Sequence, residues 1–475
     1  MSDNVMQKPS ENLLRELKFK RELSDSQIEQ VKDAIKFALD EDNYDDVNDY
    51  MNLLIDRLPE QVAVAQAIIE IVEEQLFIVD DNCELLDDVF SEYQDDAHMV
   101  CQIGHALEFA RNIDDLNEAP SEHPIFKQVI DELMLILDKV EPENERHVLN
   151  AFTSAMRMMG RQYDKQLQVY HQRLIALEPN NADNHYNYGL FCKTRGLFEQ
   201  GMLANQKALE LRGERDDATE WNLGICATGM GGETGAQVAL DIWLKREQKI
   251  AIGRFDLPDG RYPSTKVKLA THPLAERHAD NDYPGQQETI WIERLSPCHG
   301  IVRSVLYYDL GVDYGDVILH DGAPITYHKY GDDSIPVFPH LATIKHMNYQ
   351  FYDFAAIQNE KGQVNQLDKD FDDEAVIYVH TENVNIICST CFNDAQLDRE
   401  VKPASDNVQV VTGRIAAPPD MSAQSLLVQV TQALVNSECE LYSPSLCEAA
   451  EDSDKAFEHQ QKYDLLLSEY DEHHH

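Results

Sequence analysis

The chain has 475 residues, of which 43% are hydrophobic and 27% are charged, a composition typical of folded globular proteins. This length exceeds what one hydrophobic core supports, so we expect two or three domains. Asp and Glu number 86 against 40 Lys and Arg, which gives a formal net charge of −46. Such a field repels nucleic-acid phosphates and anionic membrane surfaces and attracts cationic partners, so direct nucleic-acid binding is not expected.

Signals for export, membrane insertion and disulfide formation are weak in this sequence. The first residues contain no apolar segment of the signal-peptide kind, and the most apolar run, residues 62–72, is interrupted by Gln66 and Glu70. Nine cysteines without framework spacing indicate reduced thiols. We therefore expect a cytoplasmic protein without a membrane span, and we exclude His473–His475 from functional reasoning because they resemble a purification tag.

After an N-terminal segment, residues 1–24, apolar residues recur at helical spacing. Helices are predicted over residues 44–58, 62–79, 85–93 and 125–142. Between residues 37 and 100 the only Lys or Arg is Arg57. The acidic cluster formed by Asp42, Asp45, Asp46 and Asp49 is a candidate interface for a basic partner. The alternative is that the acidity only keeps the protein soluble.

A repeat of about 34 residues follows. Gly189 and Gly224 are 35 residues apart, and each is preceded two positions earlier by an asparagine, Asn187 or Asn222. Gly196, Phe198 and Ala208 follow Gly189, whereas Ala155 lies 34 residues before it. Each unit is predicted to be two amphipathic helices joined by a short turn, with small residues where the helices approach closely.

This pattern resembles the tetratricopeptide repeat over residues 148–247, and weaker helical repeats extend the expected array to residues 25–249. The resemblance implies a concave groove that holds extended peptides. It places Tyr186, Asn187, Lys193 and Asn222 on that groove, where amides could bind a peptide backbone. The alternative is that these are ordinary exposed polar residues.

The second half has a different character. Residues 250–286 contain turn signals such as Pro258-Asp259-Gly260 and are expected to be a linker. Residues 287–450 are expected to form a β-rich α+β domain, and residues 451–475 an acidic C-terminal helix and tail. The predicted strands cover residues 288–295, 301–308, 316–320, 375–380, 384–388 and 408–411.

Three further local expectations concern this half. Residues 422–435 and 452–470 are predicted to be helices, and residues 359–373 a solvated loop. The Asp321-Gly322 pair predicts a β-hairpin turn. The fold class is therefore α+β, with an N-terminal α-helical repeat solenoid of tetratricopeptide type followed by a β-rich α+β domain.

Metal and catalytic motifs are sparse. Cys388 and Cys391 form a CxxC pair that could bind zinc or act as a redox dithiol, and Cys298 and His299 are the nearest additional ligands. The favoured interpretation is that these cysteines are packed structural residues and that no cofactor is bound. No P-loop and no GxSxG motif occurs, and six histidines of the second half have no HxH or HxxxH spacing.

The function we expect is that of a non-enzymatic adaptor, scaffold or chaperone-like binder. Its groove and acidic surface would bind a peptide or a basic protein partner. The alternative is an enzyme or metal-binding module in the β-rich half, with the helical array recruiting its substrate. The sequence leaves the partner and the oligomeric state open.

Overall fold

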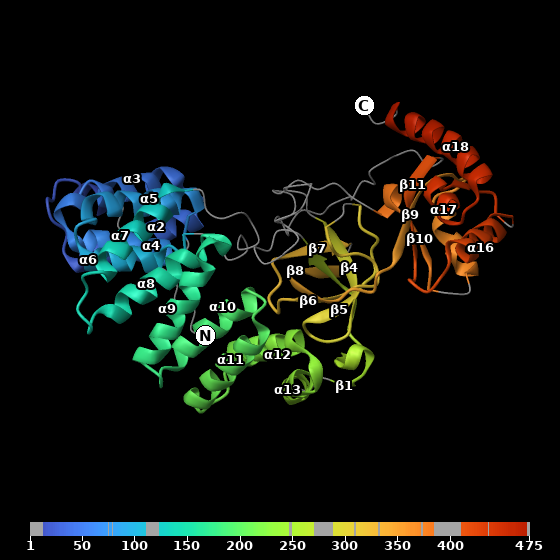
Figure 1. Ribbon diagram of the computed structural model, residues 1–475. Helices are drawn as coiled ribbons and strands as arrows, with labels where there is room; N and C mark the ends of the chain where they lie inside the picture. Colours follow the sequence, from blue (N-terminus) through green and yellow to red (C-terminus); the bar gives the residue numbers. More distant parts are fainter. Residues whose placement is uncertain are drawn as a thin grey trace. The chain divides into compact units, whose positions relative to one another are not determined.

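The computed structural model describes residues 13–472 except 75, 78, 111–122, 247–248, 270–287, 308–309, 331–332, 372–373, 384–409 and 436. Helices dominate the first half and strands the second, so the expected mixed α and β class is confirmed (Figure 1). The chain divides into two compact units. Unit 1 contains Met1–Phe191 with Glu210–Gly213, and unit 2 contains Cys192–Leu209 with Glu214–His475.

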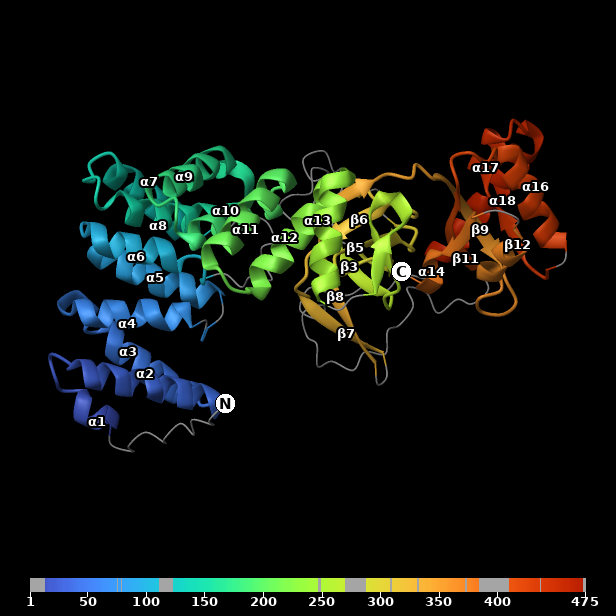
Figure 2. The same ribbon diagram turned by 90° about the horizontal axis from the view of Figure 1, so that it is seen from below.

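Unit 1 consists of helices whose layers follow one another in chain order (Figure 2). Alternate helices contact each other in succession, α2 with α4, α4 with α6 and α6 with α8, while α5 contacts α7. The bounds are α1 (Leu13–Leu17), α2 (Asp25–Asp40), α3 (Tyr44–Ile55), α4 (Val62–Glu73), α5 (Val79–Tyr93), α6 (Ala97–Ala106), α7 (Pro124–Leu137), α8 (Glu145–Arg157) and α9 (Asp164–Leu177). Helices α10 (Ala182–Thr194) and α11 (Phe198–Arg212) follow and cross the boundary between the units.

Local sequence explains where several of these helices begin. The Asn43 side chain accepts a hydrogen bond from the Asp46 amide at the start of α3, and Asp96 accepts from two amides at the start of α6. Pro124 occupies the first position of α7, where its missing N–H costs nothing. Gly104 allows α6 to approach its neighbours closely, because a Cβ there would lie 3.0 Å from Leu133 and 3.1 Å from Ala151.

In unit 2, α12 (Asp217–Met230) and α13 (Gly232–Lys245) share a hydrophobic core with the first β-sheet. Trp243 is fully buried and packs against Gly224, where an added Cβ would lie 2.5 Å from the indole. Cys298, Leu319 and Leu341 contribute to the same core from the strands. These helices therefore fold together with strands that lie far from them in sequence.

The first sheet has the order β3-β4-β5-β6-β8-β7. Because β3 also pairs in parallel with β8, five of these strands close into a barrel around an aliphatic core, and β7 extends it at β8. A separate two-stranded sheet pairs β1 (Ile250–Ile252) with β2 (Pro258–Gly260). The bounds are β3 (Thr265–Lys268), β4 (Thr289–Arg294), β5 (His299–Val302), β6 (Val317–His320), β7 (Thr326–Tyr330) and β8 (Asp333–Lys345).

A second, antiparallel sheet has the order β10-β11-β9-β12. Successive residues of β9, such as Phe354 and Ala355, belong to different cores on the two faces. One face is covered by α16 and α17, the other by α18. The bounds are β9 (Gln350–Ile357), β10 (Val376–Val379), α14 (His380–Asn383), β11 (Val410–Ala417), α16 (Ala423–Val435), β12 (Glu440–Tyr442), α17 (Pro444–Ala449) and α18 (Ser453–Glu472).

Three local expectations differ from the structure. The described part of the expected linker, residues 250–269, forms β1, β2 and β3, because apolar residues such as Val267 belong to the barrel core. The stretch expected to be a solvated loop contains the 3₁₀ helix η6 (Val364–Asp370), in which Val364 and Leu367 are buried. The Asp321-Gly322 turn does not join a hairpin, because β6 and β7 both pair with β8 rather than with each other.

Candidate functional site

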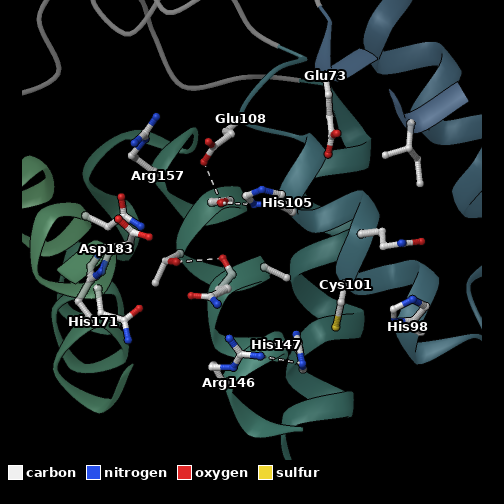
Figure 3. A pocket seen from close by; sticks show the side chains of 18 of the residues that line it. Glu73, His98, Cys101, His105, Glu108, Arg146, His147, Arg157, His171 and Asp183 are labelled. Carbon is white, nitrogen blue, oxygen red and sulfur yellow. Dashed lines mark hydrogen bonds between the residues drawn. The ribbon is translucent and has the colours of Figure 1, made fainter. Parts of the chain in front are cut away.

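A polar groove of about 770 Å³ lies in unit 1, and most of its lining comes from the alternate helices α4, α6, α8 and α10 (Figure 3). On each helix the lining residues recur at intervals of three or four, as in Gln66, Ile69, Glu70 and Glu73 of α4. The other lining residues are His98, Cys101, Gln102, His105, Glu108, Arg146, His147, Asn150, Ala151, Thr153, Ser154, Arg157, His171, Asn181, Asp183, Asn184 and Asn187.

Side-chain amides are prominent in this groove. A side-chain amide both donates and accepts hydrogen bonds, so it can donate to the carbonyl and accept from the N–H of a peptide backbone. Asn184 is held in place by a 3.2 Å bond from its Nδ2 to the Leu174 carbonyl, whereas Asn187 is exposed one helical turn further on. The amides are those of Gln66, Gln102, Asn150, Asn181, Asn184 and Asn187.

The charged residues of the groove are distributed unevenly. Glu73 and Glu108 lie on one side, and Arg146 and His147 lie on the opposite side (Figure 3). Arg146 is already engaged, since its guanidinium lies 3.6 Å from Glu178 and 3.2 Å from the His147 ring. The side with the two carboxylates, here called the acidic side, also carries Arg157, and the opposite side is basic.

Ser154 connects two helices across the groove. Its hydroxyl donates to the Glu108 carboxylate at 2.8 Å and lies 3.1 Å from His105 Nδ1. In a Ser-His-acid triad the histidine lies between the serine and the acid, whereas here the serine is central. Because the hydroxyl hydrogen is directed at Glu108, the His105 ring donates to Ser154 and does not activate it. The arrangement orients Glu108.

Cys101 does not supply a nucleophile either. Burial raises the pKa of its thiol to about 11, so the thiol stays protonated near neutral pH. The chemistry that these groove residues offer is hydrogen bonding and charge pairing with a ligand.

The residues predicted for the groove divide between the two units. Asn187 lines the groove, and Tyr186, half-buried beside it, carries the Arg212 guanidinium 5.2 Å from its ring centroid. Lys193 is buried and forms two bonds of 2.8 and 3.0 Å to Asp321 in unit 2. Asn222 is also buried, on α12. Lys193 and Asn222 therefore do not line this groove. They belong to the part of the helical sequence that packs with the strands of unit 2.

The candidate metal ligands Cys298 and His299 are fully buried, Cys298 in the bend before β5 and His299 as the first residue of β5. Burial raises the pKa of the Cys298 thiol to about 11 and lowers the pKa of His299 to about 3. His299 Nδ1 lies 2.5 Å from the Ser296 hydroxyl. Within the described ranges no group of three or more His, Cys, Asp or Glu residues could hold a metal ion. Cys388 and Cys391 lie outside the described residues.

The acidic cluster of Asp42, Asp45, Asp46 and Asp49 is exposed. Asp45 and Asp46 occupy the first turn of α3, where carboxylates interact favourably with the helix dipole. The Asn43 amide donates to Asp46 at 2.8 Å. Part of this acidity therefore has a local structural role in starting the helix.

Glu73, His105, Glu108 and Ser154 were not among the predicted site residues. A signal was present, because polar residues recur at helical spacing on the face of α6 that lies opposite its buried residues. His98, Gln102 and His105 belong to the polar face, whereas Met99, Val100 and Ile103 are buried. The polar face of α6 lies next to α8 because of how the helices pack. The periodicity of a single helix does not predict that packing.

The chain matches no protein-family model and no curated protein sequence. In the part of the chain that the structure describes, no helix is both long enough and apolar enough to cross a membrane.

Proposed function

We propose that this protein is a non-enzymatic adaptor, and that unit 1 is a tetratricopeptide-type solenoid which binds an extended segment of a protein partner. The observation that carries the proposal is the groove of about 770 Å³, lined with amides from alternate helices. Its volume lies within the range of roughly 300–1,000 Å³ that is usual for ligand sites.

The helix contacts support this function. In a stacked array of helix pairs, the first helices of successive pairs lie side by side and form one surface. Here α2, α4, α6 and α8 contact one another in that order, and three of them line the groove. Asn150 on α8 and Asn187 on α10 thus offer hydrogen bonds to the backbone of a segment that crosses the helices.

The acidic cluster on α3 fits a basic partner, and we propose the cytoplasm as the place where the two meet. The β-rich part is proposed to be a second interaction surface without a bound cofactor. Zinc held by Cys388 and Cys391 is the alternative for that part, and measuring the zinc content of the purified protein distinguishes the two. One zinc ion per chain, lost on mutating both cysteines, would favour the alternative.

The groove is tested by selecting random 12-residue peptides displayed on phage against the full-length protein. Selected peptides should bind the Asn150→Ala/Asn187→Ala double variant about tenfold or more weakly, because each lost amide removes hydrogen bonds that contribute roughly 1 kcal/mol. Val169→Ala is the control, since Val169 on α9 is 59% exposed and lies outside the groove.

The expected control result is unchanged peptide affinity. If no peptide is enriched, or if enriched peptides bind the double variant as tightly as the natural protein, the groove is not the binding site.

A further inference from the structure

The acidic side of the groove is built from carboxylates on two helices. Glu73 ends α4, and Glu108 follows the end of α6. Both point into the groove (Figure 3). Glu108 is held in one orientation by the Ser154 hydroxyl, which in turn is bonded to His105. At least one of the two carboxylates therefore has a position set by α8.

Glu73 differs from the glutamates next to it. Glu70 pairs with Lys32 of α2, and Glu74 pairs with Lys36 at 2.7 Å. Glu73 forms no hydrogen bond or ion pair with any residue that the structure describes, although it is partly buried. Burial raises its pKa, His105 partly opposes this rise, and the neighbouring Glu70 and Glu108 carboxylates add to it with smaller effects. A cation bound at Glu73 would relieve this unfavourable interaction.

A third polar residue lines the same groove. The side-chain oxygen of Gln102 on α6 is buried and has no hydrogen-bond partner among the described residues. Leaving a buried acceptor unpaired costs roughly 1–3 kcal/mol, but this oxygen has no solvent-accessible surface and would have to turn toward the groove to accept from a ligand. Arg157 lies on the same side of the groove but forms no ion pair with either carboxylate within the described part of the chain.

We infer that the segment bound in the groove carries an arginine side chain, whose guanidinium group binds Glu73 and Glu108. This inference rests on the proposed function. Arginine fits better than lysine because a guanidinium group has five N–H donors in a fixed plane and can serve several acceptors at once. The net charge of −46 favours the approach of such a cationic segment.

The test uses the full-length protein and four fluorescent peptide libraries, Ac-X5-Z-X5-NH2, in which the central residue Z is Arg, Lys, Gln or Glu. Affinities are measured by fluorescence anisotropy at fixed ionic strength. The Arg library should bind roughly tenfold more tightly than the Gln library, as expected for charge-assisted hydrogen bonds, and the Glu library more weakly still.

In the Glu73→Gln/Glu108→Gln variant, the affinity for the Arg library divided by the affinity for the Gln library should fall to about one. The matched control is Glu74→Gln, at the residue that follows α4. It should keep the full ratio, because Glu74 pairs with Lys36 outside the groove. If the double variant does not fold, Glu73→Gln alone, which retains the bond between Ser154 and Glu108, should lower the ratio by about threefold.

The outcomes separate the two proposals. If peptides bind and depend on Asn150 and Asn187 while the four libraries bind equally, the arginine inference is overturned and the peptide-binding function stands. An Arg preference that persists in the Glu73 variants also overturns the inference. If no library binds at all, the proposed function fails.

Discussion

Arg57 is buried at the end of α3, where its guanidinium group donates hydrogen bonds to four backbone carbonyls. One acceptor is Leu53 near the end of α3, and the others are Leu17, Lys18 and Lys20 at and just after the end of α1. The last carbonyls of a helix have no partner within it, so a cation there satisfies groups that would otherwise be unpaired. Arg57, the only Lys or Arg in the sequence between residues 37 and 100, therefore stabilises the packing of α1 against α3.

Replacing Arg57 with Ala should lower the free energy of unfolding of unit 1 by about 2–4 kcal/mol. The reason is that several charge-assisted hydrogen bonds are lost and the carbonyls that accepted them are left without a donor. The effect is measured by urea unfolding followed by far-ultraviolet circular dichroism. Arg21→Ala is the control. Its side chain is 82% exposed and, among the described residues, pairs with Glu60, so we expect a much smaller loss than for Arg57→Ala. Equal losses in the two variants would contradict this role.

Two buried histidines of the barrel make unit 2 sensitive to acid. Burial lowers the pKa of His299 and of His320 to about 3, and both side chains are fully buried. In the unfolded chain a histidine has a pKa near 6.5. Below that pH the unfolded chain takes up protons that the folded barrel does not, so stability is present above pH 6.5 and is lost as the pH falls.

The free energy of unfolding of unit 2 should therefore decrease between pH 7 and pH 5.5, by at most about 1.4 kcal/mol per pH unit for each of the two histidines. All three tryptophans, Trp221, Trp243 and Trp291, lie in unit 2, so their fluorescence reports its unfolding. The His299→Gln/His320→Gln variant should show a shallower dependence, and His98→Gln, an exposed groove residue, should not. An unchanged slope in the double variant would rule this explanation out.

At the scale of elements, the contact of α12 with α13 depends on Gly224. A Cβ at this position would lie 2.5 Å from two atoms of the Trp243 indole, which is fully buried and cannot move aside easily. The contact of α6 with its neighbours at Gly104 is looser, with the closest atoms at 3.0 and 3.1 Å.

Gly224→Ala should destabilise unit 2 by about 1–3 kcal/mol, because overpacking outweighs the gain of up to about 1 kcal/mol in helix propensity. Gly104→Ala should change the stability of unit 1 by less, because the two effects nearly cancel there. Thermal unfolding of both variants checks the order. Combining Gly224→Ala with Trp243→Leu should show favourable coupling in a double-mutant cycle, and additive losses would argue against a steric cause.

At the scale of the whole molecule, the charge of −46 acts on stability as well as on partners. Repulsion among exposed carboxylates opposes the compact state, and the range of this repulsion shrinks from about 30 Å at 0.01 M salt to about 10 Å at 0.1 M. Exposed ion pairs such as that of Arg21 with Glu60 contribute little stability, so screening them with salt removes little stability.

The melting temperature should therefore rise as NaCl increases from 0.01 to 0.3 M. The Asp49→Lys variant should be at least as stable as the natural protein at low salt, since Asp49 is exposed and lies outside the first turn of α3. Asp46→Lys is the contrasting variant and should be less stable, because it loses the helix-start interactions. A melting temperature that falls with salt would show that ion pairs dominate over repulsion.

The sequence predicted several helices and strands near their observed positions, but it assigned no helix to the residues of α6. The helix expected at residues 125–142 is α7 (Pro124–Leu137), and the strand expected at residues 375–380 contains β10 (Val376–Val379). These elements carry regular apolar periodicity in a single segment. Strands β7, β8, β9 and β12 were not predicted, and in β8 the reason is that prolines and polar residues such as Pro336, Pro339 and His340 obscure the alternation.

The sequence by itself determined the properties that depend on neighbouring residues or on composition: the helical first half, the β-rich second half, the acidity and the position of Asn187. The tertiary structure decided which side chains meet. Ser154 and His105 are 49 residues apart, and Lys193 is 128 residues from Asp321, yet each pair is in contact. Helical periodicity indicates which face of a helix is polar, but it does not predict which other element of the protein packs against that face. Lys193 was therefore expected on the open groove and is buried, whereas Glu73 and Glu108 meet in that groove only because α4 and α6 pack side by side.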